Sequence, residues 1–309
     1  QNDSNTFVGH ASGSGTWVTG ASSGNTGIGS DTLKGAMNAS SYNTAVGFQS
    51  GASVTTGDQN TLMGLSSGLN LTTGNSNTII GAEAGYNAVD VDRTVIIGKN
   101  AGYAGNMTAD ADGTISIGYD SGRAVTDGQY NIHIGHQAGV ENNGDKNISL
   151  GYDAFSDSLA SLANTSNVAI GYNAMSGTWL TAASSNNIAI GSSTLTGAMN
   201  AAAGNVAIGT EACNALTTGD GNIGIGHQAL TANVSGSNNI AMGLEAGDAL
   251  TNSSDNICIG AYALSAANAG EGGNIAIGYG SGGSIDHANS DNNIILGFNA
   301  GIGGGAAMT

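Results

Sequence analysis

The chain has 309 residues, of which only 9% are charged, and 22 acidic against 5 basic residues give a formal charge of −17. A surface this anionic repels phosphate backbones and lipid headgroups, which argues against nucleic acid and membrane surfaces as partners. Fifty-three glycines without a three-residue period exclude collagen, and regularly spaced aliphatic residues argue against a disordered chain. No run of about 20 apolar residues occurs, so we expect no membrane insertion.

A short motif recurs from one end of the chain to the other. An aliphatic residue precedes a glycine seventeen times, with steps of 16 to 20 residues between successive glycines. This period is too short for helical-hairpin or propeller repeats and fits one coil of a β-solenoid. We therefore predict an all-β parallel β-roll of about 17 short coils, continuous as one rod over residues 1–309. The glycines are Gly9, Gly29, Gly47, Gly64, Gly81, Gly98, Gly118, Gly135, Gly151, Gly171, Gly191, Gly209, Gly226, Gly243, Gly260, Gly278 and Gly297.

The residues before each glycine predict a strand with two different faces. Counting the glycine as position 0, position −1 is aliphatic, and position −3 is Thr in five coils and Val or Ile in the others. These two positions share a strand face, which we expect to line the inside of the roll. Position −2 is never charged, and we expect it to face outward and pack on another chain. The pattern thus predicts a homotrimer with position −2 at its interface.

Other positions of the coil also recur. Position −4 is Asn in fifteen coils, with Thr94 and Thr114 as exceptions, which predicts a ladder of stacked amides. An amide stripe that binds a ligand is the alternative interpretation. The glycine is expected to mark a bend that a Cβ would obstruct, and the Ala, Ser or Thr at position +3 predicts a tight site.

A longer period lies above the coil. The coils at 9–170 recur from residue 171 with a 162-residue period, and Trp17 returns as Trp179 in a similar insertion. Cys213 and Cys258 lie three coils apart, about 14 Å at a strand spacing of about 4.8 Å, so we expect two free thiols.

The coil consensus resembles the YadA-like head repeats of trimeric autotransporter adhesins. The stretch from Gly64 to Gly81, with Thr72-Thr73-Gly74-Asn75 in its link, is similar to the related repeats of bacteriophage tail fibres. Together these resemblances cover essentially the whole chain. They imply a parallel β-roll, a bundle of three chains and a role in adhesion.

Candidate contact residues lie around the repeated frame. Position +1 carries rings in four consecutive coils, which predicts an aromatic strip able to stack sugars; packing of these rings is the alternative. Trp17 and Trp179 are predicted loop contacts. His133 at position −2 is a weak candidate for a metal ligand at a threefold axis, against a histidine satisfied by its neighbours. The strip consists of Tyr119, His136, Tyr152 and Tyr172.

Carboxylates at position +2 do not predict catalysis. A glycosidase needs two of them across a cleft about 5 to 9.5 Å apart, whereas these acids follow one stripe over separate coils and fit a solvated face. We expect no enzyme activity, catalytic residue or cofactor. The acids are Asp31, Glu83, Asp120, Asp153, Glu211 and Glu245.

The pattern and the resemblance together predict a structural and adhesive fibre segment. We expect a bacteriophage tail fibre on the virion that mediates attachment to a host cell, with itself and a host surface glycan or protein receptor as partners. The alternatives are the head of a trimeric adhesin on a bacterial surface and a polysaccharide-degrading tailspike. Ice binding by a threonine array is not expected, because the threonines at position −3 are predicted to face inward.

Overall fold

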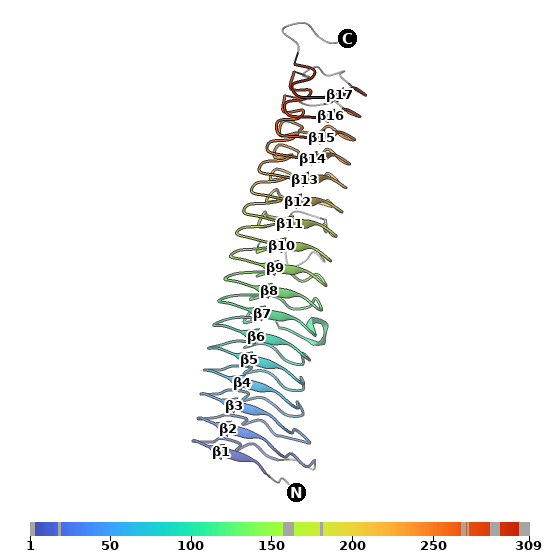
Figure 1. Cartoon of the computed structure of the whole chain (residues 1–309). Helices are drawn as coiled ribbons and strands as arrows, with labels where there is room; N and C mark the ends of the chain where they lie inside the picture. The colour runs from blue at the N-terminus through green and yellow to red at the C-terminus, as the bar shows by residue number, and fades with distance from the viewer. Residues whose placement is uncertain are drawn as a thin grey trace. The chain divides into compact units, whose positions relative to one another are not determined.

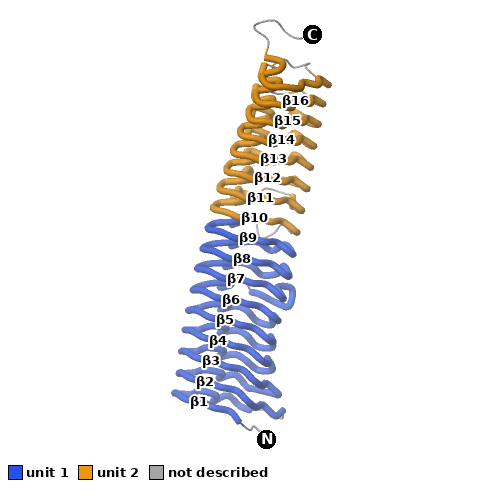
Figure 2. Tube along the Cα trace, viewed as in Figure 1, with its two compact units in different colours: residues 1–156 blue, residues 157–309 orange. Residues whose placement is uncertain are grey.

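The computed structural model describes residues 4–17, 20–104, 106–156, 164–179, 182–266, 270, 272–284 and 291–302. Seventeen three-residue strands, each parallel to its neighbours, form the sheet of a β-solenoid (Figure 1), which confirms the predicted all-β fold. The chain comprises two compact units, residues 1–156 with β1–β9 and residues 157–309 with β10–β17 (Figure 2). The described residues contain one 3-10 helix, η1 (Ala109–Ala111). They include no helix with the length and apolar composition of a membrane span.

The strands occupy positions −3 to −1 of successive coils. In the first unit they are β1 (Thr6–Val8), β2 (Thr26–Ile28), β3 (Thr44–Val46), β4 (Thr61–Met63), β5 (Thr78–Ile80), β6 (Val95–Ile97), β7 (Ile115–Ile117), β8 (Ile132–Ile134) and β9 (Ile148–Leu150). In the second they are β10 (Val168–Ile170), β11 (Ile188–Ile190), β12 (Val206–Ile208), β13 (Ile223–Ile225), β14 (Ile240–Met242), β15 (Ile257–Ile259), β16 (Ile275–Ile277) and β17 (Ile294–Leu296).

Neighbouring strands pair without any slip. Thr44 lies opposite Thr61, Ala45 opposite Leu62, and Val46 opposite Met63, and the other pairs in each unit repeat this register. Each coil position therefore stacks on the same position of the next coil, about 4.8 Å away. Any residue type that recurs at one position becomes a column along the unit.

The predicted sidedness of the strands is wrong. Leu62, Ile79 and Ile96, all at position −2, are completely buried, whereas Ile28 and Met63 at position −1 are each 44% exposed. Position −2 points into the coil, and positions −3 and −1 point away from it. The threonines at position −3 therefore face outward, so the reason given above against ice binding is also wrong.

The narrow interior explains this orientation. The coil interior is shared by positions −2 and +4, and every large apolar residue at one is matched by a small residue at the other. Leu62 pairs with Gly68, and in the reverse sense Gly224 pairs with Leu230. A Cβ on Gly68 would lie only 3.0 Å from Leu62 Cδ2. A coil this tight accepts one large side chain at this level, so the two aliphatic residues at positions −3 and −1 cannot both lie inside.

The glycine at position 0 is required for two reasons, as predicted. Its φ lies between +121° and +141° in all seventeen coils, a region that L side chains rarely adopt. In addition, a Cβ on Gly47 would lie 2.3 Å from the carbonyl oxygen of Gly64 in the next coil. Close stacking of the coils thus depends on this glycine.

The asparagines at position −4 form the predicted ladder. Asn60 donates from its backbone N and from Nδ2 to Asn43 Oδ1, both at 3.0 Å, and Nδ2 also donates to the Gly74 carbonyl at 2.8 Å. Asn77 repeats these bonds on Asn60. In the second unit, Asn205 bonds to Asn187 in the same way. The amides are buried and bonded within the coil stack, so the structural interpretation of this position holds.

The ladder predicts a graded response at Asn60. Replacement by Ala leaves the backbone N–H of Asn77 and the Gly74 carbonyl without their partner, at a cost of about 1 to 3 kcal/mol for each buried group. Replacement by Thr costs less, because Thr94 shows that a hydroxyl can make the bond to the preceding Asn, here Asn77, at 2.7 Å. The free energy of unfolding, measured in urea, should be highest for the native chain, lower for Asn60→Thr and lowest for Asn60→Ala. Equal stability of Asn60→Ala and the native chain would contradict the ladder's role.

Candidate functional surfaces

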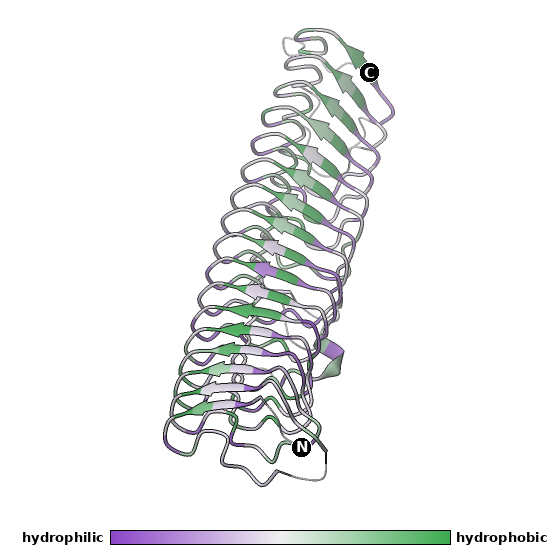
Figure 3. Cartoon of the chain, turned by 60° about the horizontal axis from the view of Figure 1, so that its bottom comes forward, coloured by the Kyte–Doolittle hydropathy of each residue, from purple (hydrophilic) through white to green (hydrophobic). Residues whose placement is uncertain are grey.

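The first candidate surface is the outer strand face, defined as the side chains at positions −3 and −1. No charged residue occurs on it in either unit. Position −1 is aliphatic or Met in every strand, while position −3 is Thr in β1–β5 and Val or Ile in β6–β17. In Figure 3 the strands accordingly carry the green of apolar residues and are paler at the start of the N-terminal strands. Exposed, mostly apolar surface of this kind makes the outer strand face a candidate interaction site.

The ring column consists of Tyr119, His136 and Tyr152 in the first unit. The centroids of Tyr119 and His136 are 5.1 Å apart at 18°, and those of His136 and Tyr152 are 4.8 Å apart at 7°. The rings lie face to face, so their faces cover one another and their edges meet the solvent. The sequence placed these residues in one column correctly, but inside the stack their faces are not free for sugars. Tyr172 belongs to the second unit, where it is 55% exposed.

The two tryptophans are not exposed loop contacts. Trp179 is completely buried. Trp17 is part-buried, packs edge-on against Phe7 with ring centroids 5.7 Å apart, and donates from Nε1 to the Gly13 carbonyl at 2.9 Å. Both indoles serve packing, and the prediction for Trp179 is wrong.

His133 lies inside the coil and cannot converge on a threefold axis. It is completely buried between Ser116 and Ser149, its neighbours in the adjacent strands. Neither imidazole nitrogen and neither serine hydroxyl has a hydrogen-bond partner. Burial lowers the pKa of His133 to about 4. Within the described ranges, no three His, Cys, Asp or Glu side chains gather as a metal site. Burial inside the coil contradicts the weak candidate for a metal ligand at a threefold axis, and no neighbouring side chain supplies the hydrogen bond expected in the alternative.

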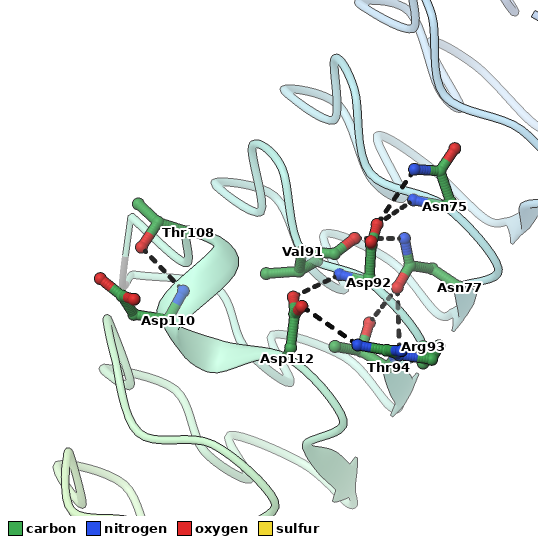
Figure 4. Close-up of polar contacts among 9 residues, drawn as sticks. All are labelled: Asn75, Asn77, Val91, Asp92, Arg93, Thr94, Thr108, Asp110 and Asp112. Atoms are coloured by element: carbon green, nitrogen blue, oxygen red, sulfur yellow. Dashed lines mark hydrogen bonds and ion pairs between the residues drawn. The ribbon is translucent and has the colours of Figure 1, made fainter.

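A second polar column runs at position −6 and was not predicted. Asp92 Oδ1 accepts from the backbone N of Asn75 at 2.7 Å, and Asp112 Oδ1 accepts from the backbone N of Asp92 at 2.7 Å (Figure 4). Arg93 Nη2 lies 3.4 Å from Asp112 Oδ2. These carboxylates bind backbone N–H groups of the preceding coil, so they hold coils together. The recurrence of Asp, Asn or Ser six residues before the glycine is the signal that could have revealed them.

The carboxylates at position +2 engage neighbouring side chains. Asp31 lies 2.9 Å from Lys34 Nζ, and its hydrogen bond to this ammonium lowers the pKa of the carboxyl. Glu211 accepts from the Gln228 side chain at 2.6 Å. Asp120, in contrast, is buried with an exposed fraction of 6%, so the predicted solvated face does not extend to every one of these acids. The bonded residues Asp31 and Glu211 do not face another carboxylate in these contacts.

The thiols of Cys213 and Cys258 are free, as predicted, and the structure shows that both are buried. Burial raises the pKa of each thiol to about 12. Both thiols therefore stay protonated and unreactive at neutral pH, because the thiolate is the reactive species.

Comparison of the chain with family models, with curated proteins and with solved structures finds no match.

The buried imidazole predicts acid sensitivity. The folded chain holds His133 neutral down to about pH 4, whereas the unfolded chain binds a proton near pH 6.5. Stability should therefore fall as the pH drops from 6.5 to 4, by about 3 kcal/mol, and the loss should stop below pH 4. His133→Ile is the matched control, because Ile79 and Ile96 fill this position in other coils, also opposite a glycine. Urea unfolding at several pH values checks this; an unchanged pH dependence in the variant would contradict it.

Proposed function

We propose that the chain is a structural segment of an attachment fibre in which three copies pack side by side through the outer strand face. The observation that carries the proposal is the absence of charge from this face, although the chain has a formal charge of −17. Elsewhere charged groups are partly exposed, as in the Lys34–Asp31 and Arg93–Asp112 pairs. A face kept apolar over successive strands favours burial against a partner.

Another copy of the chain is the partner that fits this face. Its residues recur at every strand, about 4.8 Å apart, so an occupant must present groups with the same spacing. A second copy of the chain has that spacing because it consists of the same stacked coils. Packing through this face also brings no like charges directly together, which suits a chain with so many acids.

The face extends over every strand of each unit. Two residues from each strand contribute, eighteen in β1–β9 and sixteen in β10–β17, and a standard protein interface uses roughly 20 to 30 residues on each side. Three copies form a closed ring when each packs against the next by the same heterologous contact. The resemblance to trimeric adhesin heads and phage fibres supports this number.

The biological role follows from that resemblance. We place the segment in a bacteriophage tail fibre on the virion, where it supports attachment to a host surface glycan or protein receptor. The head of a bacterial trimeric surface adhesin is the second candidate, since its repeats share the coil consensus. The exposed edges of the ring column, with the Tyr119 and Tyr152 hydroxyls and the His136 imidazole, are the proposed receptor contact.

Charge on the outer strand face should separate the copies. The double variant Ile97→Asp/Ile134→Asp places carboxylates in the proposed interface, where burial of an unpaired charge is strongly unfavourable. We expect sedimentation to give the mass of three chains for the native protein and of one chain for the variant. Gln137→Asp is the matched control, because Asp120 and Asp153 occupy the same coil position in adjacent coils. A monomeric native chain, or a trimeric double variant, would overturn the proposal.

A further inference from the structure

We infer that the threonine section, defined as Thr6, Thr26, Thr44, Thr61 and Thr78 in β1–β5, sets the direction and alignment of the copies. The inference rests on the proposed association through the outer strand face and names the part of that face that gives it specificity. These five threonines occupy position −3 and are paired in register from strand to strand.

A solenoid that associates through a uniform face has an alignment problem. Every strand is about one spacing of 4.8 Å from the next, so sliding one copy by one strand restores the same backbone geometry. Contacts between Val and Ile are non-directional and change little with such a slide. An entirely aliphatic face would therefore allow several shifted arrangements.

The threonine hydroxyls remove this degeneracy. In the part of the chain that the structure describes, the backbone N–H groups of these threonines donate to the next coil, but none of the five side-chain hydroxyls has a hydrogen-bond partner within its own chain. Thr194 at position +3, in contrast, donates to the Gly209 carbonyl at 2.7 Å. The hydrogen-bonding capacity of the threonine section is thus left for groups across the interface.

Only the parallel and aligned arrangement satisfies these hydroxyls. It brings threonine sections together, so hydroxyls can bond to one another or to shared water. A slide by one strand places the Thr78 level of one copy against the Val95 level of the next, and longer slides misplace more threonines. An antiparallel arrangement of the first unit places the section against the Val and Ile of β6–β9. In both cases buried hydroxyls lose their partners, which is unfavourable.

A single polar position among aliphatic ones is known to select register in coiled coils at some cost in stability. The threonine section applies the same physics to a sheet face. β6–β9 of the same unit carry Val or Ile at position −3, so the section ends within the unit. The boundary between Thr78 and Val95 is therefore the feature that distinguishes one alignment from the next.

Spin labels can measure the alignment in the full chain. A label on Gln137→Cys lies outside the outer strand face, and the native Cys213 and Cys258 are buried with raised thiol pKa values, so they stay unlabelled. With the native threonine section, we expect pulsed EPR to give one narrow distance between the labels on residue 137 of different copies. Replacing all five threonines by Val should keep the copies associated and add longer distances from copies shifted by multiples of about 4.8 Å.

The matched control replaces the five threonines by Ser, which retains the hydroxyls and should keep the single distance. Sedimentation and circular dichroism confirm that each variant is folded and associated. One narrow distance in the Val variant would overturn this inference and leave the proposed association intact. A native chain without any intermolecular distance would overturn both.

Discussion

The stacking of one coil directly on the next is the constraint on which the rest of the structure depends. Within each unit, the carbonyl of a position 0 glycine lies where the preceding glycine would carry a Cβ, so coils approach to one strand spacing only with glycine there. Because the register never slips within a unit, every position becomes a column. Asn at position −4 then becomes a hydrogen-bonded ladder, and Asp or Ser at position −6 becomes a second one. A residue type that recurs at one coil position therefore makes the same contact in every coil that carries it.

The same constraint decides what the molecule presents to its surroundings. A coil closed this tightly holds one large side chain at the level of its strand, as the pairs Leu62 with Gly68 and Gly224 with Leu230 show. The aliphatic residues at positions −3 and −1 are consequently left outside. The uncharged outer strand face, on which the proposed association rests, is therefore a consequence of narrow coils built from aliphatic strands. The polar triplet Ser116, His133 and Ser149 is the exception inside, and the lowered pKa of the buried His133 is the basis of the acid sensitivity predicted above.

Much of this architecture can be predicted from the sequence, but its sidedness cannot be read from periodicity. Because side chains alternate along a strand, Thr61 and Met63 must share a face. The alternation does not show whether that face lies inside or outside the coil. The deciding information is the size of the residue at position +4, six residues after position −2. It is small where position −2 is large, as in Leu62 and Gly68, and large where position −2 is small, as in Gly224 and Leu230, so these two positions share the interior. Ring orientation is beyond such reasoning as well. The spacing places Tyr119 and His136 in one column, yet only the structure shows that their faces are stacked.

The methionines test the central claim, that the outer strand face is exposed in one chain and covered in the assembly. Met63 and Met242 lie on this face, 44% and 41% exposed, whereas Met175 and Met199 are completely buried. Peroxide oxidation followed by mass spectrometry should modify all four slowly in the native assembly. In the Ile97→Asp/Ile134→Asp variant it should modify Met63 and Met242 rapidly and leave Met175 and Met199 protected. Equally rapid oxidation of Met63 in the native protein and the variant would contradict the account.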